Sequence, residues 1–218
     1  ALQNIVDSLE HAGSEIPDSY IESLLARQLA RHPEVDAFRV SDAGGNVLWG
    51  KGVVRSKPAS YADRDFFREH RKQPGQRLII TEPIVGRVSN IQVVAFTRSY
   101  RTAAGAFAGV VSAAVPVQHF TDLLSRLDLG PNGTALMRQL DNALLTRFPP
   151  VDGTAGETGA RASPDEIRRL IDAGKDRGVF HLDPAPDGIE RHYAFKRVRA
   201  MPVVVAIPVC YLFVAGSS

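Results

Sequence analysis

The sequence predicts an α+β fold made of two successive modules, each an antiparallel sheet with flanking helices. Two observations lead to this prediction. Short segments rich in alternating or β-branched apolar residues are joined by turn-forming clusters of Gly, Pro, Asn and Asp. The element order strand, strand, helix, strand, strand, strand also occurs twice along the chain. Short β connections with one helix per copy favour antiparallel sheets that carry helices on their faces.

Composition narrows the possible functions. The chain has 218 residues, 44% of them hydrophobic, which is enough to bury a sizeable core. Its net charge of +2 is far from the concentrated positive charge of a dedicated nucleic-acid binder. No window reaches the roughly 18 uninterrupted apolar residues of a membrane span. Because the first residues already follow a helical pattern, we expect the sequence to be part of a longer chain.

Two helices are expected at the start of the chain. Apolar residues at helical spacing predict the first helix over 1–12, ended by Gly13. The second is predicted to begin at Ser19, with Glu22 three residues later as a capping box. It should end at His32, because the residue before a proline disfavours the α region.

The first module is expected to follow these helices. Alternation and turn residues predict a hairpin, a helix that begins at a capping Ser60 with Asp63 three residues on, three strands and a further helix. Pro116 suits the first turn of that last helix. The predicted ranges are 38–40, 47–49, 60–72, 78–85, 91–100, 107–115 and 116–127.

The second module repeats this order in shorter form. A hairpin is predicted over 135–138 and 143–148, and a helix beginning at a capping Ser163 with Pro164 and Glu166. Strands are predicted over 179–182, 191–198 and 203–207. The single cysteine, Cys210, lies in an apolar run and is expected to be buried.

The stretch from Ser60 to Arg98 carries the candidate site. If 60–72 is a helix, Arg64 and Phe67 share one face, and Phe66 and His70 form the neighbouring pair. A guanidinium beside aromatic side chains is the usual composition of a pocket for a small anion. The alternative is that Arg64 pairs with Asp63 or Glu82 and that the phenylalanines belong to the core. Tyr61 is a further candidate.

The following strands add candidates. One face of 93–99 and one face of 108–114 carry only small, hydroxyl or valine side chains, including Thr97 and Ser112. If both faces lie on the same side, they form the floor of a binding site; otherwise they let a helix pack closely. Arg87 follows Gly86 in a turn and is placed to close over an anion. Arg98 lies on the bulkier strand face, where a buried salt bridge is favoured over ligand contact.

The sequence gives no sign of catalysis. The six histidines are scattered, and no HExxH, CxxC, GxSxG, P-loop or dinucleotide motif occurs. We therefore predict no catalytic residue, no metal site and no cofactor, and this chain is not expected to be an enzyme. In the second module, Arg191, Tyr193 and Asp187-Gly188 are interpreted as strand and turn residues, and no ligand is predicted there.

The element order and several local phrases together resemble the double Cache (PDC-like, tandem PAS-like) sensor domains of bacterial histidine kinases and diguanylate cyclases. The resemblance covers residues 2–209. The phrases are Tyr61-Ala-Asp-Arg-Asp-Phe-Phe67 with His70, Glu82-Pro-Ile-Val-Gly-Arg87, Thr97-Arg98, Ala106-Phe-Ala-Gly-Val-Val111 and Asp187-Gly-Ile-Glu-Arg191.

This resemblance implies a domain organisation and a location. Residues 1–33 would form N-terminal helices that make a homodimer contact, 34–128 a membrane-distal module with the ligand pocket, and 129–218 a membrane-proximal module. The domain would be periplasmic, and the full-length protein would be anchored in the inner membrane and carry a histidine kinase or diguanylate cyclase module. The alternative is a structural dimerisation domain with a vestigial pocket.

The resemblance also bears on the ligand. In relatives that bind amino acids or dicarboxylates, the arginine at the place of Arg64 contacts the ligand carboxylate. The amino-acid pattern has Tyr, Trp and Tyr where this sequence has Ala59, Phe66 and Phe67. The expected ligand is therefore a small organic anion, a carboxylate without an amine. The candidate ligand-binding residues are Tyr61, Arg64, Phe66, Phe67, His70, Arg87, Thr97, Arg98 and Ser112.

Overall fold

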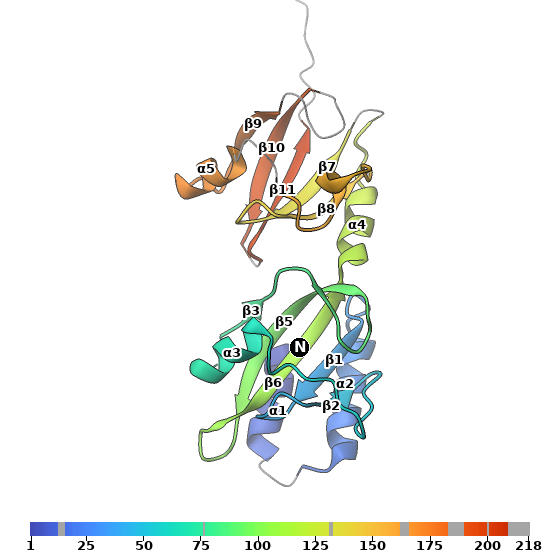
Figure 1. Ribbon diagram of the computed structural model, residues 1–218, viewed down its shortest axis with the longest axis vertical. Coiled ribbons are helices and arrows are strands. Elements are labelled where there is room, and N and C mark those ends of the chain that lie inside the picture. Colours follow the sequence, from blue (N-terminus) through green and yellow to red (C-terminus); the bar gives the residue numbers. More distant parts are fainter. Residues whose placement is uncertain are drawn as a thin grey trace, which may run out of the picture. The chain divides into compact units, whose positions relative to one another are not determined.

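The computed structural model describes residues 1–12, 16–75, 77–130, 133–161, 166–182, 190–199 and 201–208. The chain divides into two compact units, 1–117 and 118–218. Each contains one antiparallel sheet with helices beside it (Figure 1), which confirms the predicted α+β class. The helix predicted over 116–127 lies almost wholly in the second unit, whereas the sequence division placed it in the first module.

The first unit is built around two ten-residue strands, β5 and β6, which pair along their whole length. Its sheet has the order β2-β1-β6-β5-β3, and β4 also pairs with β5. The elements are α1 (Leu2–Ala12), α2 (Asp18–Ala30), β1 (Ala37–Ser41), β2 (Val47–Gly50), α3 (Asp65–Lys72), β3 (Ile79–Ile80), β4 (Ile84–Val85), β5 (Gln92–Arg101) and β6 (Phe107–Pro116).

Helices lie on both faces of this sheet. α1 packs on β5 and β6 and α2 on β1 and β2, whereas α3 packs on β5 and β6 from the other side (Figure 1). α1 buries Ile5, Val6 and Leu9, and full burial of each such side chain contributes roughly 1.5–3 kcal/mol. We call the side of the sheet that faces α3 the α3 face.

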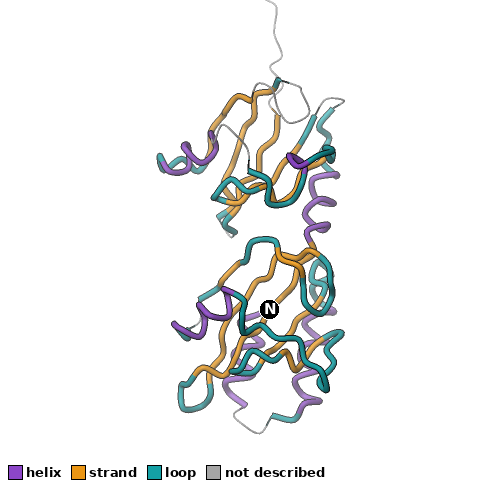
Figure 2. Tube along the Cα trace, viewed as in Figure 1, coloured by secondary structure: helices purple, strands orange, loops and turns teal. Residues whose placement is uncertain are grey.

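The connection from β2 to α3 crosses the α3 face (Figure 2). It is held to the start of β2 by backbone hydrogen bonds from Val47 to Ala59 (2.8 Å) and from Tyr61 to Gly45 (2.7 Å). Gly45 has φ +92°, and a Cβ there would lie 2.7 Å from the Ala62 nitrogen. Only glycine therefore allows this close approach, which fixes the position of Tyr61.

The predicted start of α3 and the predicted cap of α2 are wrong, whereas α2 does begin within one residue of Ser19. Ser60 forms an isolated β-bridge with Asn46, so α3 begins only at Asp65, and Arg64 is its N-cap residue with extended backbone angles. α2 begins at Asp18 with Pro17 as the N-cap residue, and no side chain caps it. The strand predicted over 78–85 is two short strands, β3 and β4, separated by 81–83.

The second unit has the sheet order β8-β7-β11-β10-β9. Phe180, Tyr193 and Phe195 form the centre of its core, and the rings of Phe180 and Tyr193 stack with centroids 5.2 Å apart. The elements are α4 (Val117–Ser125), β7 (Ala135–Gln139), β8 (Leu144–Phe148), the short 3-10 helix η2 (Thr154–Gly156), α5 (Glu166–Asp172), β9 (Arg177–Leu182), β10 (Arg191–Val198) and β11 (Val203–Pro208).

Some predictions fall outside the described residues: the stop at Gly13, the cap at Ser163, the turn at Asp187-Gly188 and the burial of Cys210. Among the helices that the structure describes, none has the length and apolar character needed to cross a bilayer.

Gly109 offers a test of the first sheet. It has φ +151°, and a Cβ there would lie 2.0 Å from the Ser41 carbonyl oxygen and 2.8 Å from the Tyr100 ring. We expect Gly109→Ala to lower the free energy of unfolding by more than about 1 kcal/mol, measured by urea denaturation. Gly105→Ala is the control, since Gly105 also has a positive φ but no atom within 4 Å of its Cβ position. Equal losses in the two variants would contradict the steric argument.

Candidate functional site

Three polar side chains form a row across the α3 face of the first unit. Strand register places Arg39 of β1 opposite Ser112 of β6, and Ser112 opposite Thr97 of β5. Opposed residues of antiparallel strands point to the same face. All three are buried, with exposed fractions of 4%, 3% and 0%. We call them the polar row.

The next row towards the start of β5 consists of alanines. Ala37, Ala114 and Ala95 are opposed in the same way, two residues from the polar row on each strand. The strand register shows that the small and hydroxyl-bearing faces of β5 and β6 lie on the same side, which is the condition for a binding floor, and α3 also packs on this side, as the alternative of close helix packing requires. They face α3, since Thr97 contacts its His70.

Tyr61 lies over the middle of the polar row. Its hydroxyl is 3.2 Å from the Ser112 hydroxyl, and its ring packs edge-on against Phe66 with centroids 5.3 Å apart. Burial raises the pKa of Tyr61, while the Ser112 hydrogen bond and the charges of Arg39 and Arg64 act in the opposite direction. Tyr61 thus stays protonated at neutral pH and offers an O–H donor beside two guanidinium groups.

Arg39 is the charged member of the polar row. Its Nε donates to the Lys51 carbonyl oxygen at 3.3 Å, and Nη2 lies 3.4 Å from an Asp36 carboxylate oxygen. Both distances exceed the 2.7–2.9 Å typical of charge-assisted hydrogen bonds. A buried guanidinium with long partners retains capacity to bind a further acceptor.

Arg64 and Arg87 connect the segment before α3 to the hairpin that starts at β4. The half-buried Arg64 donates from Nη2 to the Val85 carbonyl oxygen at 2.7 Å. Arg87 donates to the Ser60 carbonyl oxygen at 3.0 Å and to the Asp63 carboxylate at 2.5 Å, which lowers the pKa of Asp63. The two arginines therefore hold this segment against the hairpin from opposite directions.

His70 is nearly fully buried, with 1% of its surface exposed. Its Nε2 is 3.0 Å from the Thr97 hydroxyl oxygen, and that hydroxyl donates to the Ile79 carbonyl oxygen at 3.2 Å. Because the Thr97 proton is used in this way, we assign the Nε2 proton to the histidine. Burial lowers the pKa of His70, and the bond to Thr97 opposes this only in part, so the ring is neutral at pH 7.

Phe66 and Phe67 provide the apolar part of the site. They are 6% and 1% exposed and belong with Tyr61, Val47 and Val110 to one hydrophobic cluster. Phe67 also packs edge-on against Phe107 at 5.5 Å. The face of α3 that touches the sheet thus consists of Phe66, Phe67 and His70.

Arg98 does not join this group. Alternation along β5 places it on the face opposite Thr97, the side covered by α1 and α2. The buried salt bridge predicted for it is wrong, since no carboxylate in the described part of the chain pairs with Arg98, which is half-buried.

From the sequence, Arg39 was not selected as a candidate site residue. It lies within β1, whose five residues are all buried. A charged residue in the middle of a short buried strand is a signal in itself, because arginine is almost never fully buried without a partner. What the sequence could not give is the pairing of β1 with β6, which places Arg39 beside Ser112.

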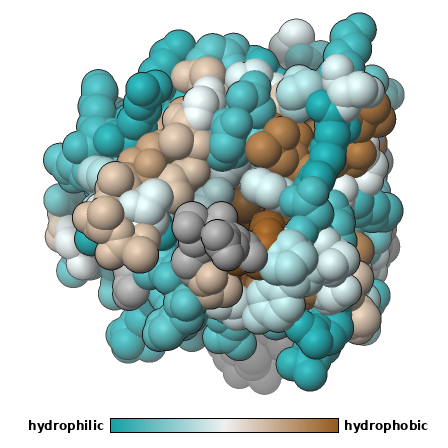
Figure 3. Space-filling view, turned by 90° about the horizontal axis from the view of Figure 1, so that it is seen from below, coloured by the Kyte–Doolittle hydropathy of each residue, from teal (hydrophilic) through white to brown (hydrophobic). Residues whose placement is uncertain are grey.

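The first unit also has an apolar pocket of about 450 Å³ on the side of α1 and α2, lined by Leu9, Ile21, Trp49 and Tyr100. Figure 3 shows apolar residues in a hollow on the surface seen from below. One basic residue, Arg101, also lines this pocket, and its guanidinium donates to the Pro74 carbonyl oxygen. This pocket suits an anion less well than the polar row.

The arrangement on the α3 face is suited to binding a small acid. The guanidinium groups of Arg39 and Arg64 and the hydroxyls of Tyr61 and Ser112 are groups suited to a carboxylate, and aromatic rings line the rest, whereas the one N–H of the neutral His70 is already donated to Thr97. In the described ranges, no three His, Cys, Asp or Glu side chains converge as they would to hold a metal ion.

Solved structures show the same fold. The chain matches the extracellular domain of a predicted histidine kinase with a TM-score of 0.80 and 26% identity, over 94% of this chain and 82% of that one. It also matches the ligand-binding domain of the Pseudomonas fluorescens chemoreceptor CtaA, solved with L-serine. That match has a TM-score of 0.63 and 16% identity, over 95% of this chain and 85% of that one.

A third similar structure is the ligand-binding domain of the Pseudomonas aeruginosa amino acid chemoreceptor PctC in complex with GABA, at a TM-score of 0.62 and 18% identity over 96% and 88% of the two chains. No protein-family model and no curated protein matches the sequence.

The buried His70 predicts a pH dependence of stability. Its pKa in the folded protein is below the ordinary value of 6.5. As the pH falls below 6.5, the unfolded chain therefore binds more protons at this residue than the folded protein does. The free energy of unfolding should therefore decrease from pH 7.5 to pH 5. His70→Gln should show a smaller decrease in urea denaturation, while the exposed His11→Gln should behave as the unmodified protein. Equal pH profiles for the His70→Gln variant and the unmodified protein would show that His70 is not the cause.

Proposed function

We propose a function on the premise that the chain has the fold of the Cache/PDC-like extracellular sensor domains of histidine kinases and chemoreceptors. The chain is the extracytoplasmic ligand-sensing domain of a membrane-bound bacterial signalling receptor. It binds a small organic anion on the α3 face of the first unit. The observation that carries this proposal is the buried Arg39, with long hydrogen bonds, beside the hydroxyls of Ser112 and Tyr61.

The ligand is a carboxylate. Guanidinium groups bind carboxylates through two parallel hydrogen bonds, and the charges of Arg39 and Arg64 both act to lower the pKa of Tyr61. The related receptors solved with L-serine, GABA and asparagine all bind molecules that contain a carboxylate. Their ligands support the same chemical group here.

An amine on the ligand would need an acidic partner. Two carboxylates among the described residues of the first unit are already paired with the site's arginines, because Asp36 pairs with Arg39 and Lys51, and Asp63 pairs with Arg87. Ala59, Phe66 and Phe67 stand where the amino-acid pattern has Tyr, Trp and Tyr. Both facts favour a carboxylate without an amine over an amino acid.

Binding acts on the segment held by Arg64 and Arg87. A ligand carboxylate that attracts the Arg64 guanidinium competes with the Val85 carbonyl oxygen, so it shifts the position of the β4 hairpin relative to α3. β5 pairs with β4 and also carries α1 on its opposite face. A movement of β5 is thereby passed to the N-terminal helices, which form the homodimer contact in this proposal.

The remaining parts of the proposal concern the whole protein. The domain lies in the periplasm, the full-length protein is anchored in the inner membrane, and a cytoplasmic histidine kinase or diguanylate cyclase module produces the output. Residues 1–33 act as the dimer contact, the first module as the membrane-distal ligand module, and the second as the membrane-proximal module.

The first test is a thermal-shift screen with aliphatic and aromatic mono- and dicarboxylates and matched amino acids. A ligand at about 100 times its dissociation constant adds roughly 2.7 kcal/mol to the free energy of unfolding, a clear rise in melting temperature. We expect a hit among acids without an amine. Arg64→Ala should weaken it by about 10- to 100-fold in calorimetry.

The control is Arg71→Ala, which removes the same charge from an exposed position on α3. Retained affinity in Arg64→Ala would refute the assignment of Arg64. Absence of any stabilising acid would favour the alternative of a structural dimerisation domain.

A second test fills the alanine row. Ala95→Leu adds volume beside the polar row at the place we propose for the ligand. Overpacking a filled core typically costs 1–3 kcal/mol, so an unfilled space predicts a smaller loss in urea denaturation. The variant should also lose the ligand-induced rise in melting temperature. A full overpacking cost together with intact ligand binding would place the ligand elsewhere.

A further inference from the structure

The second unit has an open sheet face opposite its core. Phe180, Tyr193 and Phe195 point to the core, so the alternate residues of β9, β10 and β11 form the other face. On this face, α4 lies against β8, because Thr121 is hydrogen-bonded to Thr146 at 2.6 Å. Strand register shows that Thr146 shares its face with Met137 of β7, Val205 of β11 and Lys196 of β10. α4 thus covers the β8 end.

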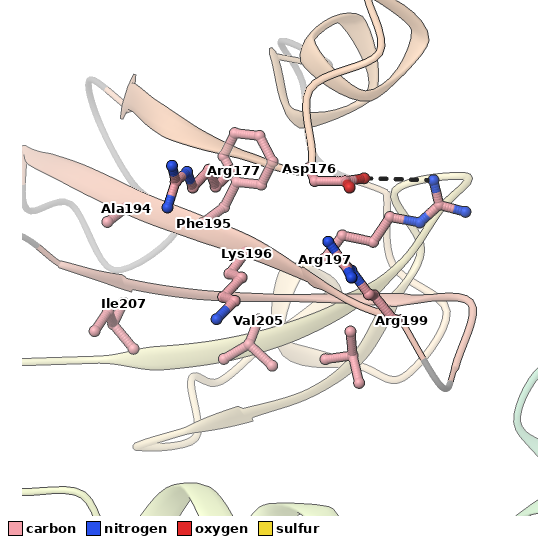
Figure 4. A pocket seen from close by; sticks show the side chains of 10 residues that line it. Asp176, Arg177, Ala194, Phe195, Lys196, Arg197, Arg199, Val205 and Ile207 are labelled. Carbon is pink, nitrogen blue, oxygen red and sulfur yellow. Dashed lines mark ion pairs between the residues drawn. The ribbon is translucent and has the colours of Figure 1, made fainter.

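A groove of about 1050 Å³ lies on this unit, along β10 and the strands beside it (Figure 4). Its floor is apolar. Ala194 is opposed by Ile207 on one side and by Val179 on the other, and Val205 follows on β11. Ile207 of β11 and Val179 of the edge strand β9 are 40% and 52% exposed, so apolar surface on both sides of Ala194 is open to solvent.

Cations also line the same groove. Arg177 of β9 is directly opposite Lys196 of β10, so two like charges share one face, an arrangement that is destabilising by itself. Arg199 also lines the groove. In the part of the chain that the structure describes, no carboxylate pairs with any of these three.

Among the described residues, one carboxylate borders the groove, and it already forms an ion pair. Asp176 pairs with Arg197 at 3.8 Å, and Figure 4 shows Arg197 extended towards Asp176, while Lys196, Val205 and Ile207 lie together on one side of the strands. The net charge of the groove is therefore strongly positive, and its potential attracts an anion.

We propose that this groove binds an amphiphilic anion, a molecule with an acidic head group on an aliphatic chain. The head group lies between Arg177 and Lys196, where it removes their mutual repulsion, and the chain covers Ala194, Val205 and Ile207. The groove is concave and bounded by cations, which suits one molecule in its length better than the flat surface of a bilayer. This site is separate from the polar row and does not depend on it.

The experiment is isothermal titration calorimetry with decanoate, kept below its micelle concentration, on the chain carrying Arg64→Ala so that the first unit contributes little. Decanoate should bind more tightly than octanoate by about four-fold per methylene, the effect of about 0.8 kcal/mol for each buried CH₂. Lys196→Gln and Arg177→Gln should each weaken binding about ten-fold. Lys175→Gln, an exposed charge outside the groove, is the matched control and should leave the affinity unchanged.

Further probes separate the alternatives. Ile207→Ser should reduce the dependence on chain length, because it removes apolar floor. Inorganic phosphate that binds as tightly as decanoate would refute the apolar part of the proposal. If vesicles of phosphatidylglycerol bind and monomeric decanoate does not, the proposal of a site for a single molecule is refuted. If Lys175→Gln and Lys196→Gln lose equal affinity, binding depends on net charge alone, and the proposed position of the head group is refuted.

Discussion

The buried guanidinium of Arg39 is the constraint on which the α3 face of the first unit depends. Taking an ionised group out of water is costly unless it is paired and hydrogen-bonded. Asp36 and the Lys51 carbonyl oxygen supply that pairing at 3.4 and 3.3 Å, so the ends of β1 and β2 must keep their relative position. The guanidinium in turn brings a positive charge to a place where the neighbouring strands offer only hydroxyls and alanines.

Periodicity and turn residues predicted the order of the elements, because local alternation reflects which side of a strand is buried. They also gave β5 and β6 one face each of small or hydroxyl-bearing residues, but only the pairing of the two strands shows that Thr97 and Ser112 share one side. The start of α3 could not be predicted in this way. Ser60 has a sound local role as a cap, but it pairs with Asn46 instead, and that contact depends on the fold of the whole unit.

Only the residues of the candidate site that are close in sequence or lie on adjacent strands could be selected from the sequence, because local patterns do not give long-range strand pairing. Tyr61, Phe66, Phe67, His70, Thr97 and Ser112 come together because they lie on α3, on the segment before it or on the paired strands. Arg39 comes from a strand more than 50 residues earlier than Thr97, and only the register of β1 on β6 brings it beside Ser112. In the second unit, Arg177 and Lys196 are likewise neighbours only through the pairing of β9 with β10.

The two units share one sheet order, so their equivalent positions can be compared. Arg138 on β7 takes the place of Arg39, but Val204 replaces Ser112, and the Arg138 guanidinium donates to the carbonyl oxygens of Asn142 (2.8 Å) and Ala160 (3.2 Å).

The neighbouring row of residues differs between the two units in side-chain volume. The first unit has Ala37, Ala114 and Ala95 where the second has Leu136, Ala206 and Phe195, which belong to a packed hydrophobic cluster. One Phe and one Leu in place of two alanines fill the space above the sheet. The same positions therefore carry bulkier side chains in the second unit than in the first, where the cluster of Tyr61, Phe66 and Phe67 packs on the α3 face instead. For this reason we place the proposed small-acid site on the α3 face of the first unit, and the proposed groove of the second unit on its outer sheet face.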